Sequence, residues 1–182
     1  SSTSRGIARR AHWSYLDTGA LYRAITWLAL EKNCEDENVL VDLAIENEIS
    51  FKTDPLNPRV YVGGIDISEA IRSLRITDKV SEFARMPRIR EYLLGLQQTL
   101  IASATNGIVV EGRDIGTVVA PDAPLKIFLY ADIKARTDRR ENEMQEKVST
   151  EVVEKSLAGR DAIDMSRAVS PLRPAEDALE ID

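Results

Sequence analysis

Short clusters of arginine beside glycine, aspartate and hydroxyl residues are the features of this sequence most able to do chemistry. In residues 17–23, Asp17 and Thr18 stand where a helix is expected to begin, and Arg23 follows about one turn later. Helix N-termini attract anions, and arginine binds phosphate through paired hydrogen bonds. The segment is therefore a candidate phosphate site. A well-capped helix with a solvated arginine is the alternative.

A second cluster, Glu111-Gly112-Arg113-Asp114, directly follows an apolar run at 108–110. In parallel α/β sheets, ligands bind at the C-terminal ends of the strands. Gly112 would allow a ligand to approach the backbone, Arg113 would bind phosphate, and Asp114 would accept a hydrogen bond. A surface turn with a local Arg–Asp pair is the alternative.

Three further clusters contain the same residue types. The first is Ser81 with three arginines at 85–90, around a proline that begins a helix. The second is a set of arginines at 136–140 on a charged helix. In the third, at 160–167, two arginines and an aspartate are spaced at i, i+4 and i+7 and would share one helix face. Each has a plain alternative in a solvated helix face, where surface ion pairs contribute little energy. The residues concerned are Arg85, Arg88, Arg90, Arg136, Arg139, Arg140, Arg160, Asp164 and Arg167. Taken together, the five clusters indicate phosphate chemistry.

The composition excludes several other functions. The chain has 182 residues, a formal net charge of −6 and a pI of about 5.0, which disfavours general nucleic-acid binding. Cys34 and His12 are the only cysteine and histidine, so an intrachain disulfide and a zinc site of Cys and His clusters are both excluded. No apolar run approaches the roughly 20 residues of a membrane span. A single cysteine fits a reducing, cytoplasmic location.

The elements that must position these clusters alternate between helix and strand. The serine- and arginine-rich start predicts a helix with Ile7, Ala8 and Ala11 on one face, with part of a transit peptide as the alternative. Helices are also expected to about residue 32 after the turn at 17–19, and over 35–47, 78–84, 87–104, 132–146 and 150–160. Strands are expected at 13–16, 108–110, 127–129 and 178–182. The two wholly apolar runs among these are typical of buried parallel strands.

Between residues 49 and 104 the sequence pattern changes to short apolar runs separated by turn residues. Asp54-Pro55 predicts a turn that interrupts regular secondary structure. Gly63-Gly64 is a two-residue hairpin signal between short apolar runs. The pattern therefore predicts an α/β core over 1–48 and 105–182, a small insert over 49–104, and a charged segment over 137–167.

The ordered motifs of this chain resemble those of bacterial cytidylate kinase, a P-loop nucleoside monophosphate kinase family. The likeness runs through nearly the whole sequence and includes the strand-bearing insert. The residues that carry it are 16–23, 112–119 with 121–123, and 160–161, 167–169 and 171–172. It implies a three-layer core with a parallel sheet, a monophosphate-binding insert at 49–104, and a helical lid at 137–167.

The resemblance also implies the activity, which is transfer of the γ-phosphate of ATP to CMP or dCMP with Mg²⁺ as cofactor. The partners would be small nucleotides, with no nucleic acid and no membrane, and the enzyme would be a cytoplasmic monomer. By analogy, the CMP site comprises Thr18, Tyr22, Arg23, Ser81, Arg90, Gly112, Arg113, Asp114, Asp164 and Arg167. Arg23, Arg113 and Arg167 would hold the phosphate. Ser81, Arg90 and Asp114 would recognise cytosine, and Asp164 would bind the ribose.

The ATP side of the site follows from the same analogy. The residues implied are Ser1, Ser2, Arg139, Arg140 and Arg160, with Ser1 as a ligand of Mg²⁺ and Arg160, Arg167 and Arg113 as the catalytic arginines. The family begins with a strand and a P-loop ending in Gly-Lys-Ser, and the lysine would fall immediately before Ser1. We therefore expect a kinase provided that a P-loop precedes Ser1. The alternatives are an inert CMP-binding remnant and a related P-loop kinase for another acceptor.

Overall fold

A computed structural model describes residues 2–132, 134, 135, 137, 138, 159 and 172–181. The chain divides into two compact units, Ser1–Gly112 and Arg113–Asp182. The larger unit contains the whole range expected for the insert, 49–104, together with the helices and strands that precede it. The expected boundaries at 49, 104, 137 and 167 stay predictions.

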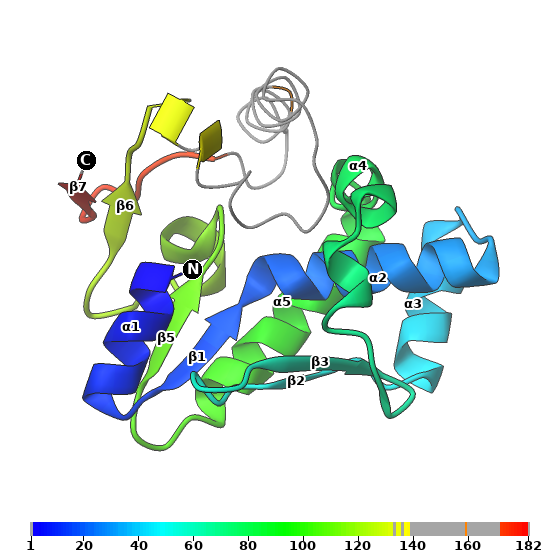
Figure 1. Cartoon of the computed structure of the whole chain (residues 1–182), viewed down its shortest axis with the longest axis horizontal. Coiled ribbons are helices and arrows are strands. Elements are labelled where there is room, and N and C mark those ends of the chain that lie inside the picture. The colour runs from blue at the N-terminus through cyan, green and yellow to red at the C-terminus, as the bar shows by residue number, and fades with distance from the viewer. Residues whose placement is uncertain (1, 133, 136, 139–158, 160–171, 182) are drawn as a thin grey trace. The chain divides into compact units, whose positions relative to one another are not determined.

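Two sheets lie in the larger unit (Figure 1). Strands β1 (Ser14–Asp17) and β5 (Ile108–Glu111) pair in parallel, with Asp17 opposite Glu111. Strands β2 (Ser50–Lys52), β3 (Arg59–Val62) and β4 (Ile65–Asp66) form an antiparallel sheet in that order. Gly63 and Gly64 join β3 to β4 at φ 58° and 75°, which confirms the hairpin. Such positive φ angles are open to glycine at little steric cost.

The helices of this unit largely follow the expected positions. They are α1 (Ser2–Ala11), α2 (Thr18–Lys32), α3 (Glu37–Glu46), α4 (Leu74–Phe83) and α5 (Pro87–Ala102), with a 3₁₀ turn η1 (Ala70–Arg72). Helix α4 begins four residues before the expected start at 78. Its buried residues include Ile76 and Val80, one turn apart, and Ser73 lies at its N-cap with extended backbone angles.

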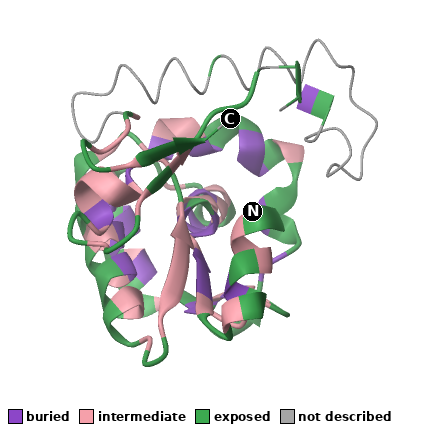
Figure 2. Cartoon of the chain, turned by 90° about the vertical axis from the view of Figure 1, so that its left-hand side faces the viewer, coloured by how far each residue is buried: buried purple, intermediate pink, exposed green. Residues whose placement is uncertain are grey.

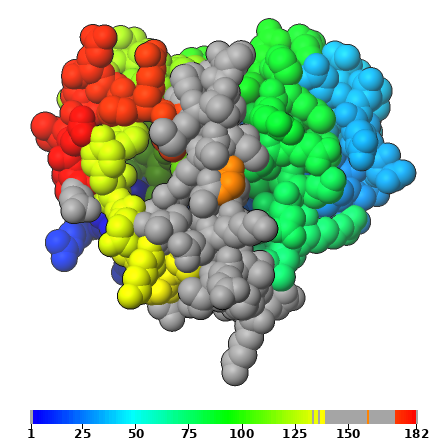
Figure 3. Space-filling model, turned by 90° about the horizontal axis from the view of Figure 1, so that it is seen from above, coloured from blue at the N-terminus to red at the C-terminus, as the bar shows by residue number. Residues whose placement is uncertain are grey.

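Helix α2 is the centre of the hydrophobic core. Asp17 caps it by accepting a hydrogen bond from Ala20 N at 3.3 Å, and Asn33 ends it in the left-handed conformation. The expected core face is confirmed, because Leu21, Ile25, Leu28 and Ala29 are all buried. Residues of α3, α5 and the small antiparallel sheet pack in the same core. The start of α3 lies beside the start of α5, where Arg88 N donates to Glu37 Oε2 at 3.0 Å (Figure 3).

The expected apolar face of α1 is only partly correct. Ala8 is fully buried, whereas Ile7 is 43 % exposed and Ala11 is half-buried. The face that α1 turns toward β1 and β5 is centred on Ala8, whose carbonyl accepts from Trp13 N at 2.9 Å. Ile7 is adjacent in sequence and so lies about 100° around the helix.

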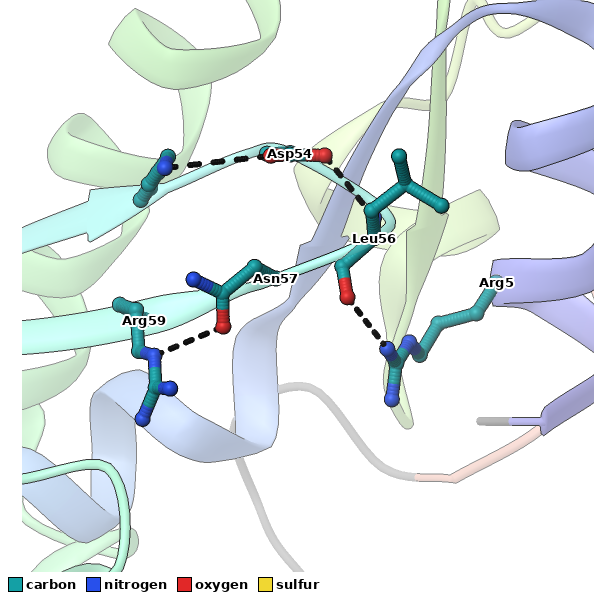
Figure 4. A network of polar contacts seen from close by, with 6 residues as sticks. Arg5, Asp54, Leu56, Asn57 and Arg59 are labelled. Carbon is teal, nitrogen blue, oxygen red and sulfur yellow. Dashed lines mark hydrogen bonds and ion pairs between the residues drawn. The ribbon is translucent and has the colours of Figure 1, made fainter.

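Arg5 ties α1 to the loop between β2 and β3 (Figure 4). Its guanidinium donates from Nε to Pro55 O at 3.2 Å and from Nη2 to Leu56 O at 3.3 Å. Within the loop, Asp54 Oδ1 accepts from Leu56 N at 2.9 Å, which closes a tight turn. The loop path is therefore held by its own carboxylate and by an arginine from a distant helix.

The smaller unit contains one turn of π-helix, η2 (Ile115–Val119), and the parallel strands β6 (Ile127–Leu129) and β7 (Leu179–Ile181). Strands are thus confirmed at 127–129 and near 178–182. Their expected burial is not confirmed, because Ile127 and Leu129 are 43 % and 58 % exposed. Residues of β5 are only half-buried (Figure 2). In the part of the chain that is described, each of these sheets has two strands, which leaves more surface uncovered than a wide sheet would.

Much of the charged segment lies outside the described residues. In the helix expected over 132–146, residues 134, 135, 137 and 138 are helical. Of the helix expected over 150–160, residue 159 alone is described, and it is also helical. No helix in the described part of the chain is both long enough and apolar enough to cross a membrane.

Candidate functional site

Polar side chains gather where β1 and β5 end, at the C-terminal edge of their sheet. Asp17 and Glu111 are opposite each other in the parallel register. The Tyr15 hydroxyl donates to Glu111 Oε1 at 2.8 Å, and the Thr18 hydroxyl donates to Glu111 O at 2.9 Å. The start of α2 is therefore fastened to the end of β5, at the position where α/β proteins bind ligands.

This edge has an unusual electrostatic environment. Burial raises the pKa of Asp17 above its ordinary value, and the negative charge of Glu111 raises it further. The hydrogen bond from Ala20 N and the charges of Arg23 and Arg72 act in the opposite direction. Burial, followed by the charges of the two acids, raises the pKa of Tyr15, so its hydroxyl stays protonated and donates to Glu111.

Arg23 extends from α2 toward η1 and α4. Its Nη1 donates to Thr77 Oγ1 at 2.9 Å and to Ile71 O at 3.2 Å. Arg23 is half-buried, and its charge lies close enough to Asp17 to oppose the rise in that residue's pKa. A cation held in this way at the edge of the parallel sheet has the chemistry of a phosphate-binding group.

Arg90 and Tyr22 form a second cationic feature of the same unit. The Arg90 guanidinium carbon lies 5.6 Å from the centre of the Tyr22 ring, within the range of a cation–π contact. Arg90 is 7 % exposed, and its Nη1 donates to Ala84 O at 3.1 Å. Ser81 is half-buried on α4, one turn after Thr77 and therefore on the same helix face.

The cluster after β5 spans the division between the two units. Gly112 is exposed, Arg113 is half-buried and Asp114 is buried. The Asp114 carbonyl accepts hydrogen bonds from Val118 N at 2.9 Å and from the Thr117 hydroxyl at 3.3 Å. The predicted Gly-Arg-Asp turn therefore leads directly into η2.

Comparisons with known proteins identify the family. The family model described as cytidylate kinase matches residues 1–182. The chain belongs to the cytidylate kinase family. A cytidylate kinase of Streptomyces avermitilis is 46 % identical over all of this chain and 79 % of its own length. A cytidylate kinase of Streptococcus thermophilus is 45 % identical over all of this chain and 82 % of its own, and one of Streptococcus sanguinis is 42 % identical, with 83 % of its length covered.

Membership of the cytidylate kinase family confirms the resemblance seen in the sequence and the α/β class of the fold. Six of the residues implied for the CMP site lie within one unit, namely Thr18, Tyr22, Arg23, Ser81, Arg90 and Gly112. Ser2 is exposed at the start of α1. Six implied residues lie outside the described part of the chain, namely Ser1, Arg139, Arg140, Arg160, Asp164 and Arg167.

Sequence reasoning assigned no ligand-binding role to several residues that contact or adjoin these groups. Asp17 and Glu111 lie within the sequence motifs described above, and their position directly after expected strands was a usable signal. Tyr15 and Thr77 carried no local signal, because their partners are 96 and 54 residues away. Such partners become visible only when the chain is folded.

The described residues also line an open groove at the opposite end of β1 and β5. It is formed by Gly6, Arg9, Arg10, His12, Trp13, Asp54, Pro55 and Leu56. Because Trp13 immediately precedes β1, this groove lies at the N-terminal ends of the strands and includes none of the predicted site residues.

Proposed function

We infer that this chain transfers the γ-phosphate of ATP to CMP or dCMP and so forms CDP or dCDP, a step of pyrimidine nucleotide metabolism. The observation that carries this conclusion is the cytidylate kinase family match across residues 1–182. The chain is a phosphotransferase of that family. An inert CMP-binding remnant and a kinase for a different acceptor are both less favoured, because relatives at 42–46 % identity share the name cytidylate kinase.

The acceptor phosphate would be held by Arg23, Arg113 and Arg167, with Thr18 and Tyr22 lining the pocket. The geometry at Arg23 supports its part in this assignment, because the guanidinium is anchored through Nη1 beside the strand ends. A phosphate oxygen of CMP is already anionic, so it can attack the γ-phosphorus while the bond to the leaving ADP oxygen breaks. No general base is required, and catalysis depends on positioning and on cations that neutralise spread charge.

Cytosine would be recognised by Ser81, Arg90 and Asp114. The 4-amino group of cytosine is a donor that the Asp114 carboxylate can accept, and the ring acceptors suit the Arg90 guanidinium. Uracil has an oxygen in place of the amino group, which would face the carboxylate. The low exposure of Arg90 and Asp114 supports the proposal, since polar partners away from water reject a mismatched base most strongly. Asp164 would bind the ribose hydroxyls.

ATP would be bound by Ser1, Ser2, Arg139, Arg140 and Arg160, with Mg²⁺ accompanying the nucleotide. Among the described residues, no three His, Cys, Asp or Glu side chains are grouped to hold a metal ion. A single protein oxygen, the Ser1 hydroxyl, would suffice for Mg²⁺, because kinases bind this ion mainly through substrate phosphate oxygens. The bound ion would neutralise phosphate charge. Arg160, Arg167 and Arg113 would orient the phosphates during transfer.

The organisation proposed for the enzyme follows the sequence. The core comprises 1–48 and 105–182, the monophosphate-binding insert comprises 49–104, and the lid comprises 137–167. The small antiparallel sheet β2-β3-β4 lies within the insert and supports this division. We propose that the enzyme acts as a cytoplasmic monomer on free nucleotides.

The test is a substrate panel with the purified full-length protein. Phosphoryl transfer from ATP in the presence of MgCl₂ would be measured for CMP, dCMP, UMP and AMP. We expect kcat/KM for CMP and dCMP to exceed that for UMP by at least about tenfold. Equal transfer to UMP would contradict the base-reading residues. CMP binding without transfer to any acceptor would instead identify an inert CMP-binding module.

A further inference from the structure

Thr77 on α4 lies in direct contact with the arginine proposed to hold the CMP phosphate. Its Oγ1 accepts from Arg23 Nη1 at 2.9 Å and donates to Ser73 O, one turn earlier in the same helix, at 3.0 Å. Thr77 is 7 % exposed, so this contact is largely withdrawn from water. We propose that Thr77 is a positioning residue that orients Arg23 for the acceptor phosphate. This inference rests on the role proposed for Arg23.

The direction of each hydrogen bond favours this role. A threonine hydroxyl has one hydrogen, and here it is directed to Ser73 O. The lone pairs of Oγ1 are therefore available to the guanidinium, and the hydroxyl acts toward Arg23 purely as an acceptor. Its dipole is consequently aligned with the positive charge of Arg23.

The two hydrogen bonds of Arg23 restrict the orientation of its guanidinium. Both of the hydrogen bonds to Thr77 and Ile71 are made by Nη1. Two-point recognition of a phosphate uses a pair of parallel N–H groups. Holding Nη1 against α4 and η1 therefore limits the orientations in which the planar guanidinium can present its paired N–H groups to a phosphate.

Positioning would act by reducing the conformational freedom that Arg23 loses on binding. A long arginine side chain has many rotamers, and ordering it lowers the net affinity gained from its hydrogen bonds. Thr77 would impose that order before CMP arrives. It would also link α2, which carries Arg23 and Tyr22, to α4, which carries Ser81 and contacts α2 (Figure 1).

The decisive variants are Thr77→Val and Thr77→Ser. Valine keeps the branched shape but removes the acceptor, whereas serine keeps the hydroxyl. Ser73 O still accepts from the Thr77 backbone N at 3.0 Å, so the valine variant leaves this carbonyl with a donor. In the full-length enzyme we expect Thr77→Val to raise the KM and the Kd for CMP by about tenfold, as for one lost hydrogen bond to a charged group. The KM for ATP should change by less than about twofold, and Thr77→Ser should restore most of the CMP affinity.

A matched control is Thr99→Val on α5. Thr99 makes the same bond to the carbonyl one turn earlier, Gly95 O at 2.9 Å, but it is exposed, lies nine residues after Arg90 on α5 and has no part in the proposed site. This variant should leave the KM for CMP unchanged. A comparable rise in both valine variants would assign the effect to helix stability and overturn the inference.

Arg23→Ala and the double variant Arg23→Ala/Thr77→Val separate this inference from the proposed site itself. If Arg23→Ala leaves the Kd for CMP unchanged, the phosphate role of Arg23 fails, and the inference about Thr77 fails with it. If Arg23→Ala weakens CMP binding, Thr77→Val should add nothing further in that background. An additional weakening of the same size as in the single variant would overturn the positioning role while leaving the proposed function intact.

Discussion

Asp17 and Glu111 occupy opposite positions on the parallel strands β1 and β5, so two acidic residues end the same sheet as neighbours. Each has its own donor, because Asp17 accepts from Ala20 N and Glu111 accepts from the Tyr15 hydroxyl. The arrangement keeps two like charges together at the edge where α/β proteins bind their ligands. This arrangement disfavours the ionised form of Asp17, whose pKa is raised by burial and by the charge of Glu111.

Asp17→Asn should therefore stabilise the protein at pH 7. With a raised pKa, the folded state binds the Asp17 proton more tightly than the unfolded state does, so Asp17 contributes less stability as pH rises between its unfolded and folded pKa values. Asparagine removes the charge and is an equally good N-cap. We expect a higher free energy of unfolding at pH 7, with the gain vanishing below about pH 4, the ordinary pKa of aspartate.

The measurement is urea-induced unfolding of both proteins at pH 7 and pH 4. A gain of about 1 kcal/mol would also raise Tm by about 2–4 °C. Asp36→Asn is the matched control, because Asp36 is the exposed N-cap of α3 and accepts from Asn38 N and Val39 N. It should show a similar, small change at both pH values. A difference for Asp17→Asn that is independent of pH would contradict the electrostatic explanation.

Tyr15→Phe should destabilise the larger unit. Tyr15 is 2 % exposed, and its hydroxyl donates to a carboxylate at 2.8 Å. Removing that donor should lower the free energy of unfolding by about 1.5–3 kcal/mol. Tyr130→Phe removes a similar bond to Glu180, but between exposed groups, and should change the stability far less. If chemical denaturation shows equal losses of unfolding free energy for the two variants, burial does not determine the contribution of the Tyr15 hydrogen bond.

Gly107→Ala and Gly95→Ala should change stability in opposite directions. Gly107 has φ 106°, and a Cβ there would lie 3.0 Å from the Trp13 indole ring. Backbone strain and this contact should lower stability by about 1–3 kcal/mol. Gly95 lies exposed within α5, and a Cβ there would meet open space, so alanine should add about 0.5–1 kcal/mol through helix propensity. Thermal unfolding of both variants would test the pair, and a Tm for Gly107→Ala at or above that of the parent would count against it.

Asp114→Asn should reduce the preference for CMP over UMP. An amide can present either a donor or an acceptor to the base, whereas the carboxylate favours the amino group of cytosine. We expect the ratio of kcat/KM for CMP to that for UMP to fall by about tenfold or more. An unchanged ratio, measured under identical ATP and MgCl₂ concentrations, would remove Asp114 from base recognition.

The parts of this fold that are encoded locally were predictable from the sequence. Helical spacing of apolar residues located α2 and its buried face, and the capping position of Asp17 was readable from residue type. The Gly63-Gly64 turn likewise followed from the conformations that glycine adopts. The ordered motifs then indicated the family, because their combination is far more specific than any one of them.

The remaining features depend on contacts that local patterns do not encode. The exposure of Ile7 reflects which side of α1 meets the sheet, and the exposure of Ile127 reflects how few of the described strands lie beside it. The early start of α4 and the turn η1 likewise follow from their packing against α2. Thr77 was not singled out for the same reason, since an ordinary helical threonine became a partner of Arg23 only through the approach of α4 to α2.

The Arg5 contact has an evolutionary consequence. Both of its acceptors are backbone carbonyls, at Pro55 and Leu56, so the contact depends on the route of the loop and not on the side chains it carries. Leu56 is 66 % exposed, and substitutions there that preserve the turn would leave both acceptors in place. Substitution of Arg5 itself would disrupt the contact, because even lysine lacks the planar guanidinium that donates to both carbonyls. Sequence drift should therefore be permitted on one side of this contact and restricted on the other.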